Sequence, residues 1–115
     1  WINLKQCAVE ENVMLLPGSL FRKMADEVYA KAEAEPNIVY QISGTRTGLA
    51  CVAYNHGVMI TLDHMIFNNV FAEQILPLSI GEKPMYTDLD LVYMKDTVLT
   101  KEIETLKNIM TEAIQ

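Results

Sequence analysis

The chain has 115 residues, of which 50% are hydrophobic and 21% are charged, a length that suits one domain with its own core. The formal net charge is -6 and the nine Lys and Arg residues are scattered, which argues against nucleic-acid binding by this chain alone, because phosphate contacts need clustered basic side chains. No apolar run approaches the length that crosses a bilayer, and the first residues do not form a signal peptide, so we expect a cytoplasmic protein without membrane contacts.

Two further features concern the ends and the cysteines. The chain starts at Trp1 without an initiator Met, so we expect a piece cut from a longer protein or a processed product. Cys7 and Cys51 both lie in apolar sequence contexts, which favours buried reduced thiols over a disulfide or a redox switch.

The first predicted elements are a strand and a helix. The wholly apolar run Val13–Leu16 is typical of a strand that is covered on both faces, and Pro17-Gly18 turns the chain. Ser19 is a good N-cap for the amphipathic helix that follows. We expect this helix to run to about Ala34, because Glu35-Pro36 ends it.

The middle of the chain predicts a βαβ unit. A β-rich run, Ile38–Ile42, is followed by the polar turn Ser43–Thr47 and by a helix that ends at Gly57, with Leu49, Val52, Ala53 and His56 on one face. A second apolar run, Val58–Thr61, comes next. Because crossovers between parallel strands are right-handed, both strands should lie parallel in one sheet. The predicted fold class is therefore α/β, with a mainly parallel sheet and flanking helices.

The last third of the chain predicts shorter elements. Asp63 can cap a short helix that contains Met65, Ile66 and Val70, and Pro77 places the apolar run Ile75–Leu78 at a sheet edge. Leu89–Lys95 alternates in part and predicts a strand. A final helix, capped by Thr100, carries an apolar stripe of Leu99, Ile103, Leu106, Met110 and Ile114.

Topology suggests where a ligand would bind. In open parallel sheets, ligands lie outside the carboxyl ends of the strands, which points to Ser43–Thr47 and Thr61–Asp63. The segment Gly44–Gly48 lacks the spacing of a phosphate loop, but free N–H groups at a helix start favour an anion. The competing interpretation is a simple turn in which Thr45 or Thr47 is the N-cap.

A catalytic or metal site is not predicted. His56, His64 and Asp63 lack a third ligand at a useful spacing, so solvated or capping roles are favoured. Ser19 has no His–acid pair to activate it. We therefore expect no catalytic residue, no metal and no cofactor.

Three stretches resemble one family. The run Glu11–Gly18, a helix and then Pro36–Val39 is similar to the second half of the effector-binding domain of LysR-type transcriptional regulators, as are Leu49–Ile60 and the ending Leu89–Lys95 with its helix. The resemblance covers nearly the whole chain and rests on soft patterns. Two positions depart from it: Asn55 replaces the first glycine of a Gly-x-Gly turn, where Asn tolerates the left-handed conformation, and Leu62 stands where Pro is frequent.

The resemblance implies one lobe of a periplasmic-binding-protein-like (type 2) domain. Residues 1–95 would form the second lobe, and 96–115 a terminal helix returning toward an absent first lobe. It also implies a small-molecule effector, which we expect to be anionic, homo-oligomers, and DNA binding only through an absent winged helix-turn-helix. The resemblance implies effector contacts at Ser43, with Gly44 and Thr45 beside it, and topology adds Pro17, Gly18, Ser19 and Thr61.

Two other functions stay open. The same fold occurs in extracytoplasmic solute-binding proteins, and a small α/β enzyme could use Ser19, Asp63 or His56. When one lobe of a two-lobed domain is isolated, the apolar stripe of the final helix loses its partner surface. It must then fold back on its own sheet or dock on another copy of the chain. We therefore expect a dimer or larger assembly with this helix in the contact.

Overall fold

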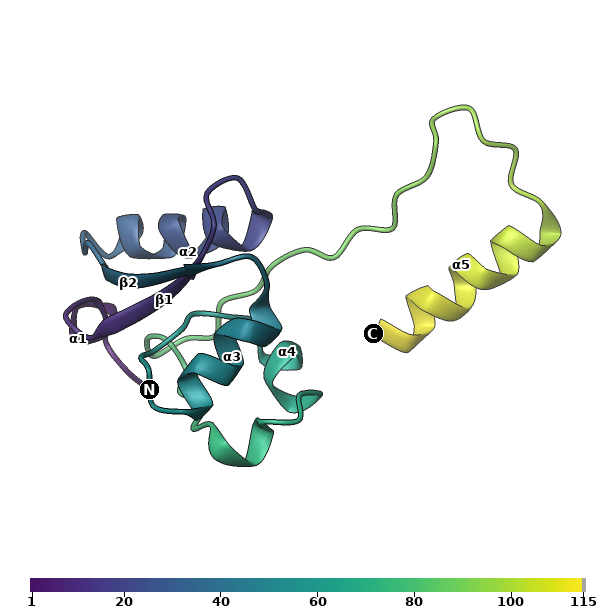
Figure 1. The fold of residues 1–115 in the computed structure, drawn as a ribbon. Helices are drawn as coiled ribbons and strands as arrows, with labels where there is room; N and C mark the ends of the chain where they lie inside the picture. Colours follow the sequence, from purple (N-terminus) through teal and green to yellow (C-terminus); the bar gives the residue numbers. More distant parts are fainter. Residues whose placement is uncertain (115) are drawn as a thin grey trace. The chain divides into compact units, whose positions relative to one another are not determined.

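The computed structural model describes residues 1–114. The chain divides into two units after Met85. The first unit contains the sheet and all but one of the helices in this part of the chain (Figure 1). Its elements are α1 (Leu4–Ala8), β1 (Glu11–Leu15), α2 (Leu20–Lys31), β2 (Asn37–Ile42), α3 (Thr45–Ala53), α4 (Asp63–Phe67) and the 3-10 helix η1 (Ala72–Gln74).

The strand β1 has a neighbour on each side. It pairs in parallel with β2 along its whole length, and on its other side Asn12 forms a parallel bridge with Val58. The N–H of Val13 donates to the carbonyl of Val58 at 2.9 Å, and the N–H of Val58 donates to the carbonyl of Glu11 at 2.8 Å. The predicted strand Val58–Thr61 is thus reduced to one bridge, but it does lie parallel in the predicted sheet.

The two longer helices of this unit flank the strands. The chain passes from β1 to β2 through α2, and then back past β1 to Val58 through α3. Right-handed crossovers that run in opposite directions place their helices on opposite faces of a sheet. Figure 1 shows α2 and α3 on the two sides of the strands, as this rule requires. The predicted α/β fold class, with a parallel sheet and flanking helices, is confirmed.

The core forms around β1, which overlaps the predicted apolar strand only at Val13–Leu15: it begins two residues earlier, at Glu11, and Leu16 lies beyond it and is exposed. Met14 packs with Ala25 and Tyr29 of α2 and with Leu4 and Ala8 of α1, while Val13 and Leu15 are also buried. Asn12 lies two residues before Met14 and therefore faces α2 as well. It is fully buried, and its Oδ1 accepts a hydrogen bond from the Tyr29 hydroxyl. Its Nδ2 donates to the carbonyls of Cys7 and Glu10, both at 2.9 Å.

The ends of α2 and α3 refine the sequence analysis. Ser19 is the N-cap of α2, as predicted, but the helix ends at Lys31 rather than near Ala34, because Glu33 adopts a positive φ of 53°. The helix α3 ends at Ala53, before the predicted Gly57. Asn55, with φ 62°, takes the left-handed conformation that was expected of it.

Five predictions of local structure were wrong. No strand forms at Ile75–Leu78 or at Leu89–Lys95, since neither run finds a neighbouring backbone; instead Ile80 forms a bridge with Ile2. The N-cap of α3 is Gly44 rather than a threonine, and that of α4 is Leu62 rather than Asp63. Val70 lies beyond the end of α4. The short helix α1, with its Asn3 cap, was not foreseen.

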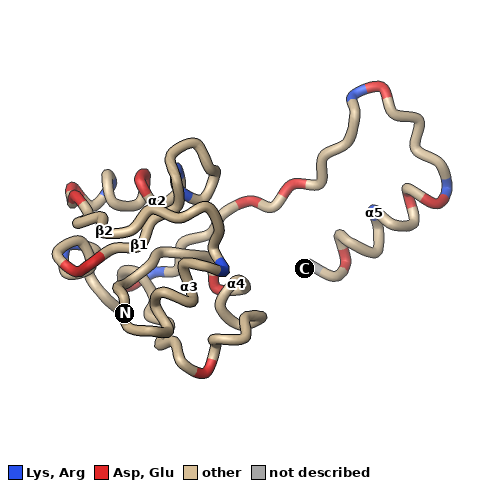
Figure 2. The backbone as a smooth tube through the Cα atoms, in the orientation of Figure 1, with Lys and Arg blue, Asp and Glu red and all other residues tan. Residues whose placement is uncertain are grey.

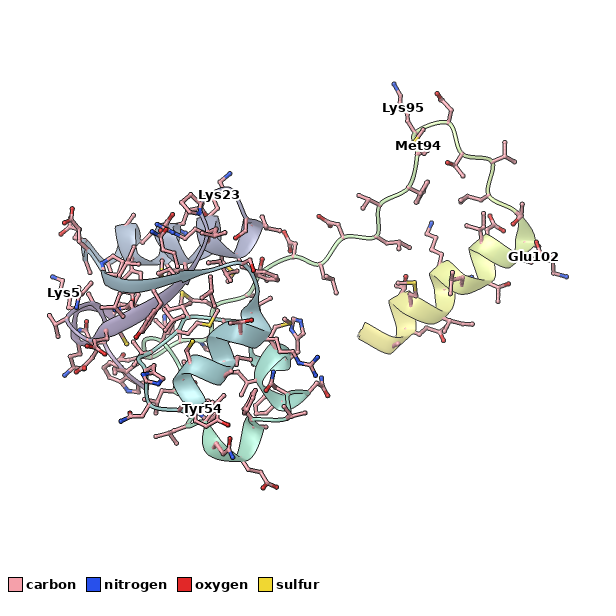
Figure 3. All side chains as sticks on the ribbon, viewed as in Figure 1. Lys5, Lys23, Tyr54, Met94, Lys95 and Glu102 are labelled. Atoms are coloured by element: carbon pink, nitrogen blue, oxygen red, sulfur yellow. The ribbon has the colours of Figure 1, made fainter. Side chains whose placement is uncertain are left out.

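The second unit consists of an extended segment and the helix α5 (Lys101–Ile114). A turn closed by the N–H of Thr97 on the carbonyl of Met94, at 3.0 Å, precedes the helix (Figure 3). The hydroxyl of Thr100 accepts the N–H of Ile103 at 3.3 Å, in agreement with the predicted cap. Apolar side chains of both parts line a small cavity; they are Leu91, Val92, Tyr93, Leu99, Ile103, Leu106 and Met110, together with Lys107. The side chain of Ile114, the last member of the predicted stripe, lies outside the described residues.

Candidate functional site

The carboxyl ends of β1 and β2 bring two predicted segments to one edge of the sheet. Leu15 pairs with Ile42, and the N–H of Leu16 extends the ladder by donating to the carbonyl of Ile42 at 2.8 Å. The next residue of each chain segment is Pro17 on one side and Ser43 on the other. The turns Pro17–Ser19 and Ser43–Thr45 therefore leave the sheet side by side, as the topology argument predicted.

The first turn is held by its own backbone and by Ser19. Gly18 has φ 98°, a conformation that L side chains rarely adopt. The Ser19 hydroxyl accepts the N–H of Arg22 at 3.0 Å, and its own N–H points to the carbonyl of Leu16 at 3.4 Å. The hydroxyl of Ser19 is thus already used as a helix cap, and Ser19 can offer a ligand only its second lone pair.

The second turn opens the helix α3 without a side-chain cap. Gly44 is the N-cap, in extended backbone, and no side chain accepts the first N–H groups of the helix. Thr45, the first helical residue, is only 8% exposed, whereas Ser43 and Arg46 on either side of this stretch are exposed. Uncapped N–H groups carry the positive end of the helix dipole, which favours an anionic or carbonyl oxygen at this place.

Arg22 joins both strands at this edge, which the sequence analysis did not anticipate. Its Nη1 donates to the carbonyl of Leu15 at 2.8 Å and to Oε1 of Gln41 at 3.0 Å, and its Nε donates to Oδ1 of Asp26 at 2.9 Å. Helical spacing assigns Arg22 to the polar face of α2, which is normally turned to solvent. Its spacing of four residues from Asp26 could have indicated the ion pair, but not the contacts to the strands.

Thr61 is not tied to this edge by backbone pairing. It is half-buried in the extended stretch between the Val58 bridge and α4. Asp63 is the first residue of α4, and its Oδ1 accepts the N–H of His64 at 2.7 Å. The imidazole Nδ1 of His64 lies 4.0 Å from the same carboxylate oxygen, in an exposed pair. Of the predicted binding residues, Thr61 therefore has the least support from the geometry.

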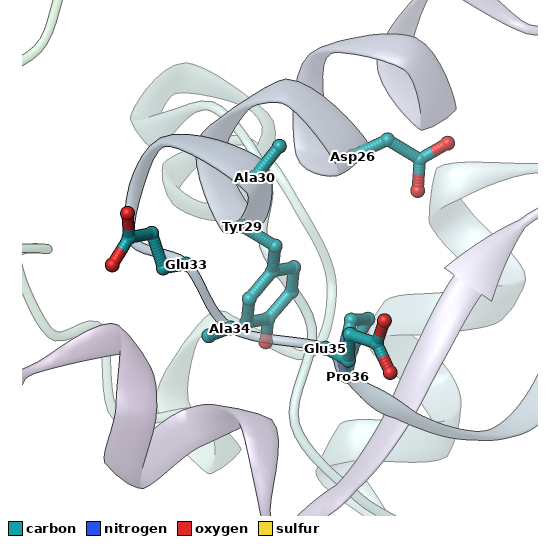
Figure 4. A pocket seen from close by; sticks show the side chains of 7 residues that line it. All are labelled: Asp26, Tyr29, Ala30, Glu33, Ala34, Glu35 and Pro36. Atoms are coloured by element: carbon teal, nitrogen blue, oxygen red, sulfur yellow. The ribbon is translucent and has the colours of Figure 1, made fainter.

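A hollow lies near the C-terminal end of α2, at the other end of this helix from Ser19 (Figure 4). It is lined by residues of α2 and of the segment that follows. The carboxylates of Asp26, Glu33 and Glu35 surround it, and Tyr29 forms part of its wall. Burial, with a smaller contribution from Cys7, raises the pKa of Tyr29 to about 12, so its hydroxyl stays protonated as the donor to Asn12. An acidic rim is unsuited to the anion that the edge at α3 would accept.

The two cysteines are the other potentially reactive side chains near the core. Cys7 and Cys51 are free and half-buried, which agrees with reduced thiols. Burial, and then the nearby Glu10, raises the pKa of the Cys7 thiol. Among residues 1–114, no group of three His, Cys, Asp or Glu side chains is placed to hold a metal ion. In the first unit, the Lys and Arg residues are spread over several elements and do not form one basic cluster (Figure 2).

Comparisons with known proteins give one match. The family model described as LysR substrate binding domain matches residues 2–115, which is nearly the whole chain. No curated protein and no solved structure matches the chain. Over the part of the chain that the structure describes, there is no helix both long enough and apolar enough to span a bilayer.

Proposed function

Because the chain belongs to the LysR substrate-binding domain family, we propose that it senses a small-molecule effector for a LysR-type transcriptional regulator, at the edge formed by the ends of β1 and β2. The fold of this family is the periplasmic-binding-protein-like type 2 fold, and the family belongs to transcription regulators rather than to enzymes. We accordingly assign the chain no catalytic residue.

One observation supports the site above all others. The uncapped start of α3 lies beside the turn Pro17–Ser19, at the same edge of a parallel sheet. Parallel α/β sheets bind ligands at such edges, since the helix starts there present N–H donors to a ligand. Ser43 adds an exposed hydroxyl next to these donors. An effector with a carboxylate or a carbonyl group would satisfy them.

The contribution of the Ser43 hydroxyl to the free energy of effector binding can be bounded. A hydrogen bond from a neutral hydroxyl to a charged ligand group contributes roughly 1–3 kcal/mol when its loss leaves the partner unpaired. Ser43 is exposed and follows β2 in a bend, so its side chain does not support the core. Replacing Ser43 with Ala should thus affect effector binding and leave the fold intact.

The finer parts of the proposal concern the whole regulator. DNA binding would reside in a winged helix-turn-helix outside this chain, because the chain is acidic and its basic residues are spread out. The regulator would act as a homo-oligomer in the cytoplasm. Within the chain, Ser43, Gly44 and Thr45 would contact the effector directly, while Pro17, Gly18, Ser19 and Thr61 would shape the surface around it.

Thermal unfolding of the chain in a panel of small carboxylates tests the proposal. At least one carboxylate should raise the melting temperature of the wild type, and Ser43→Ala should weaken its binding. Ser79→Ala is the matched control, because Ser79 is also exposed but lies in another segment, where its backbone carbonyl bonds to Ile2. Equal binding by the wild type and Ser43→Ala would reject Ser43 as a contact.

A further inference from the structure

Arg22 stands at the junction of the two strands and the two turns of the candidate site. Its side chain is only 13% exposed although it begins on a surface helix. The guanidinium bonds to three different elements: the end of β1 through the Leu15 carbonyl, β2 through Gln41, and its own helix through Asp26. Its backbone N–H also donates to the cap residue Ser19.

These contacts lie one step inside the two turns. Leu15 precedes Pro17 by two residues, and Gln41 precedes Ser43 by two residues. Beyond Leu15, one ladder hydrogen bond remains between the strands, from Leu16 to Ile42. The ends of strands fray readily where few hydrogen bonds hold them. A guanidinium that contacts both strands at this point opposes that fraying.

We propose that Arg22 is a positioning residue of the effector site, which holds the turns Pro17–Ser19 and Ser43–Thr45 at a constant separation. This role rests on the proposed function. The contacts of Arg22 with both strands, which we call the Arg22 brace, can be tested without an effector. We assign Arg22 a role through other residues, because its charge is paired with Asp26 and three of its five guanidinium N–H groups are donated to the protein.

The planar guanidinium is the reason that arginine suits this position. Its fork directs N–H groups in fixed directions, so one side chain can reach two oxygens on adjacent strands and a carboxylate on its own helix. A lysine ammonium carries the same charge but lacks the fork. Arg22→Lys should therefore behave like a variant without the brace, and not like the wild type.

Amide hydrogen exchange, resolved by residue in NMR spectra of the chain, is the primary test. In Arg22→Met, exchange at the N–H of Leu16 should become faster by about tenfold, as expected for the loss of hydrogen bonds to a charged group. The N–H of Val13, which bonds to Val58 on the other side of β1, should exchange at an unchanged rate. This pair of amides separates a local opening from a general loss of stability.

Three further variants sharpen the result. Gln41→Met removes one acceptor on an exposed side chain and should give a smaller increase at Leu16. Lys23→Met removes the same charge from the neighbouring position, where the side chain is exposed (Figure 3), and should change neither amide. Arg22→Lys should match Arg22→Met. Unchanged exchange at the N–H of Leu16 in Arg22→Met, or an equal increase at Leu16 and Val13, would contradict the proposed role of Arg22. Full protection of the Leu16 N–H in Arg22→Lys would contradict it as well.

A titration with sodium sulfate separates this inference from the proposed function. In the wild type, sulfate should shift the amide signals of Ser43, Gly44 and Thr45, relative to sodium chloride at equal ionic strength. Arg22→Met should weaken this binding by about tenfold, and Lys23→Met should not. Sulfate binding of equal strength in Arg22→Met and wild type would overturn the positioning role. An absence of any shift in the wild type would count against an anionic effector, and the exchange data alone would then decide on Arg22.

Discussion

Gly57 lies directly against the backbone of Glu11. A Cβ on Gly57 would come within 2.5 Å of the Glu11 carbonyl oxygen, and the φ of Gly57 is 133°. The same carbonyl accepts the N–H of Val58, which joins the third segment of the sheet to β1. The close approach of residue 57 thus makes possible the bridge that brings the stretch after α3 into the sheet.

Gly57→Ala should therefore destabilise the first unit by roughly 2–4 kcal/mol, since both the positive φ and the contact with a backbone carbonyl oppose a side chain. Urea denaturation would measure the change in the free energy of unfolding. Gly81→Ala is the control for conformation alone, because Gly81 also has a positive φ, of 70°, but open space around its Cβ position. Equal losses in both variants would show that the contact with Glu11 is unimportant.

Gly44→Ala should separate binding from folding. Gly44 has extended backbone, and a Cβ there would meet nothing within 4 Å, so stability should change by less than about 0.5 kcal/mol. The added methyl group lies on the N-cap residue of α3, next to the uncapped N–H groups where the effector is proposed to bind. Binding of the stabilising carboxylate should weaken. A variant that unfolds more easily but binds normally would contradict both parts of this prediction.

Tyr29→Phe tests the buried hydrogen bond to Asn12. Both side chains are almost fully buried, and the loss of the hydroxyl would leave Oδ1 of Asn12 without its partner. The free energy of unfolding should fall by about 1–3 kcal/mol. Tyr54→Phe is the matched control, because Tyr54 is 70% exposed and its hydroxyl can bond to water (Figure 3). Comparable losses in the two variants would show that the bond to Asn12 adds nothing.

The same tyrosine predicts a dependence on alkaline pH. The pKa of Tyr29 is raised to about 12 in the folded chain, above the usual tyrosine value of 10.0. A raised folded-state pKa gives stability that is complete below the unfolded-state value and is lost as the pH rises through the folded-state value. The wild type should lose stability between these two pH values. In Tyr29→Phe this loss should be smaller, as measured by urea denaturation across that range.

The helix α5 predicts self-association. Ile103, Leu106 and Met110 are 40%, 56% and 40% exposed within their unit, which is a large apolar surface for one face of a helix. We expect the isolated chain to form a dimer or a larger assembly through this face. Sedimentation at micromolar concentrations should show the assembly in the wild type and a monomer in Leu106→Lys. Asn108→Lys, which alters an exposed position on another face, should still associate.

The sequence by itself determined the local elements of the first unit. Continuous apolar residues predicted β1, and the Ser19 cap and apolar periodicity predicted α2. The order of strand, helix, strand and helix placed the turns Pro17–Ser19 and Ser43–Thr45 at one edge. These features follow from interactions between residues that are near in the chain, namely side-chain periodicity, capping and the conformational limits of Pro and Gly.

Only the tertiary structure decided which backbone groups found distant partners. The run Leu89–Lys95 has the composition of a strand but forms none, because a strand exists only where another backbone accepts its hydrogen bonds. Arg22 has the pattern of a solvated helix residue, yet it contacts Leu15 and Gln41 across the sheet edge. Such partners are selected by position in space, and residues 19 apart in the chain meet only after the sheet and α2 have packed.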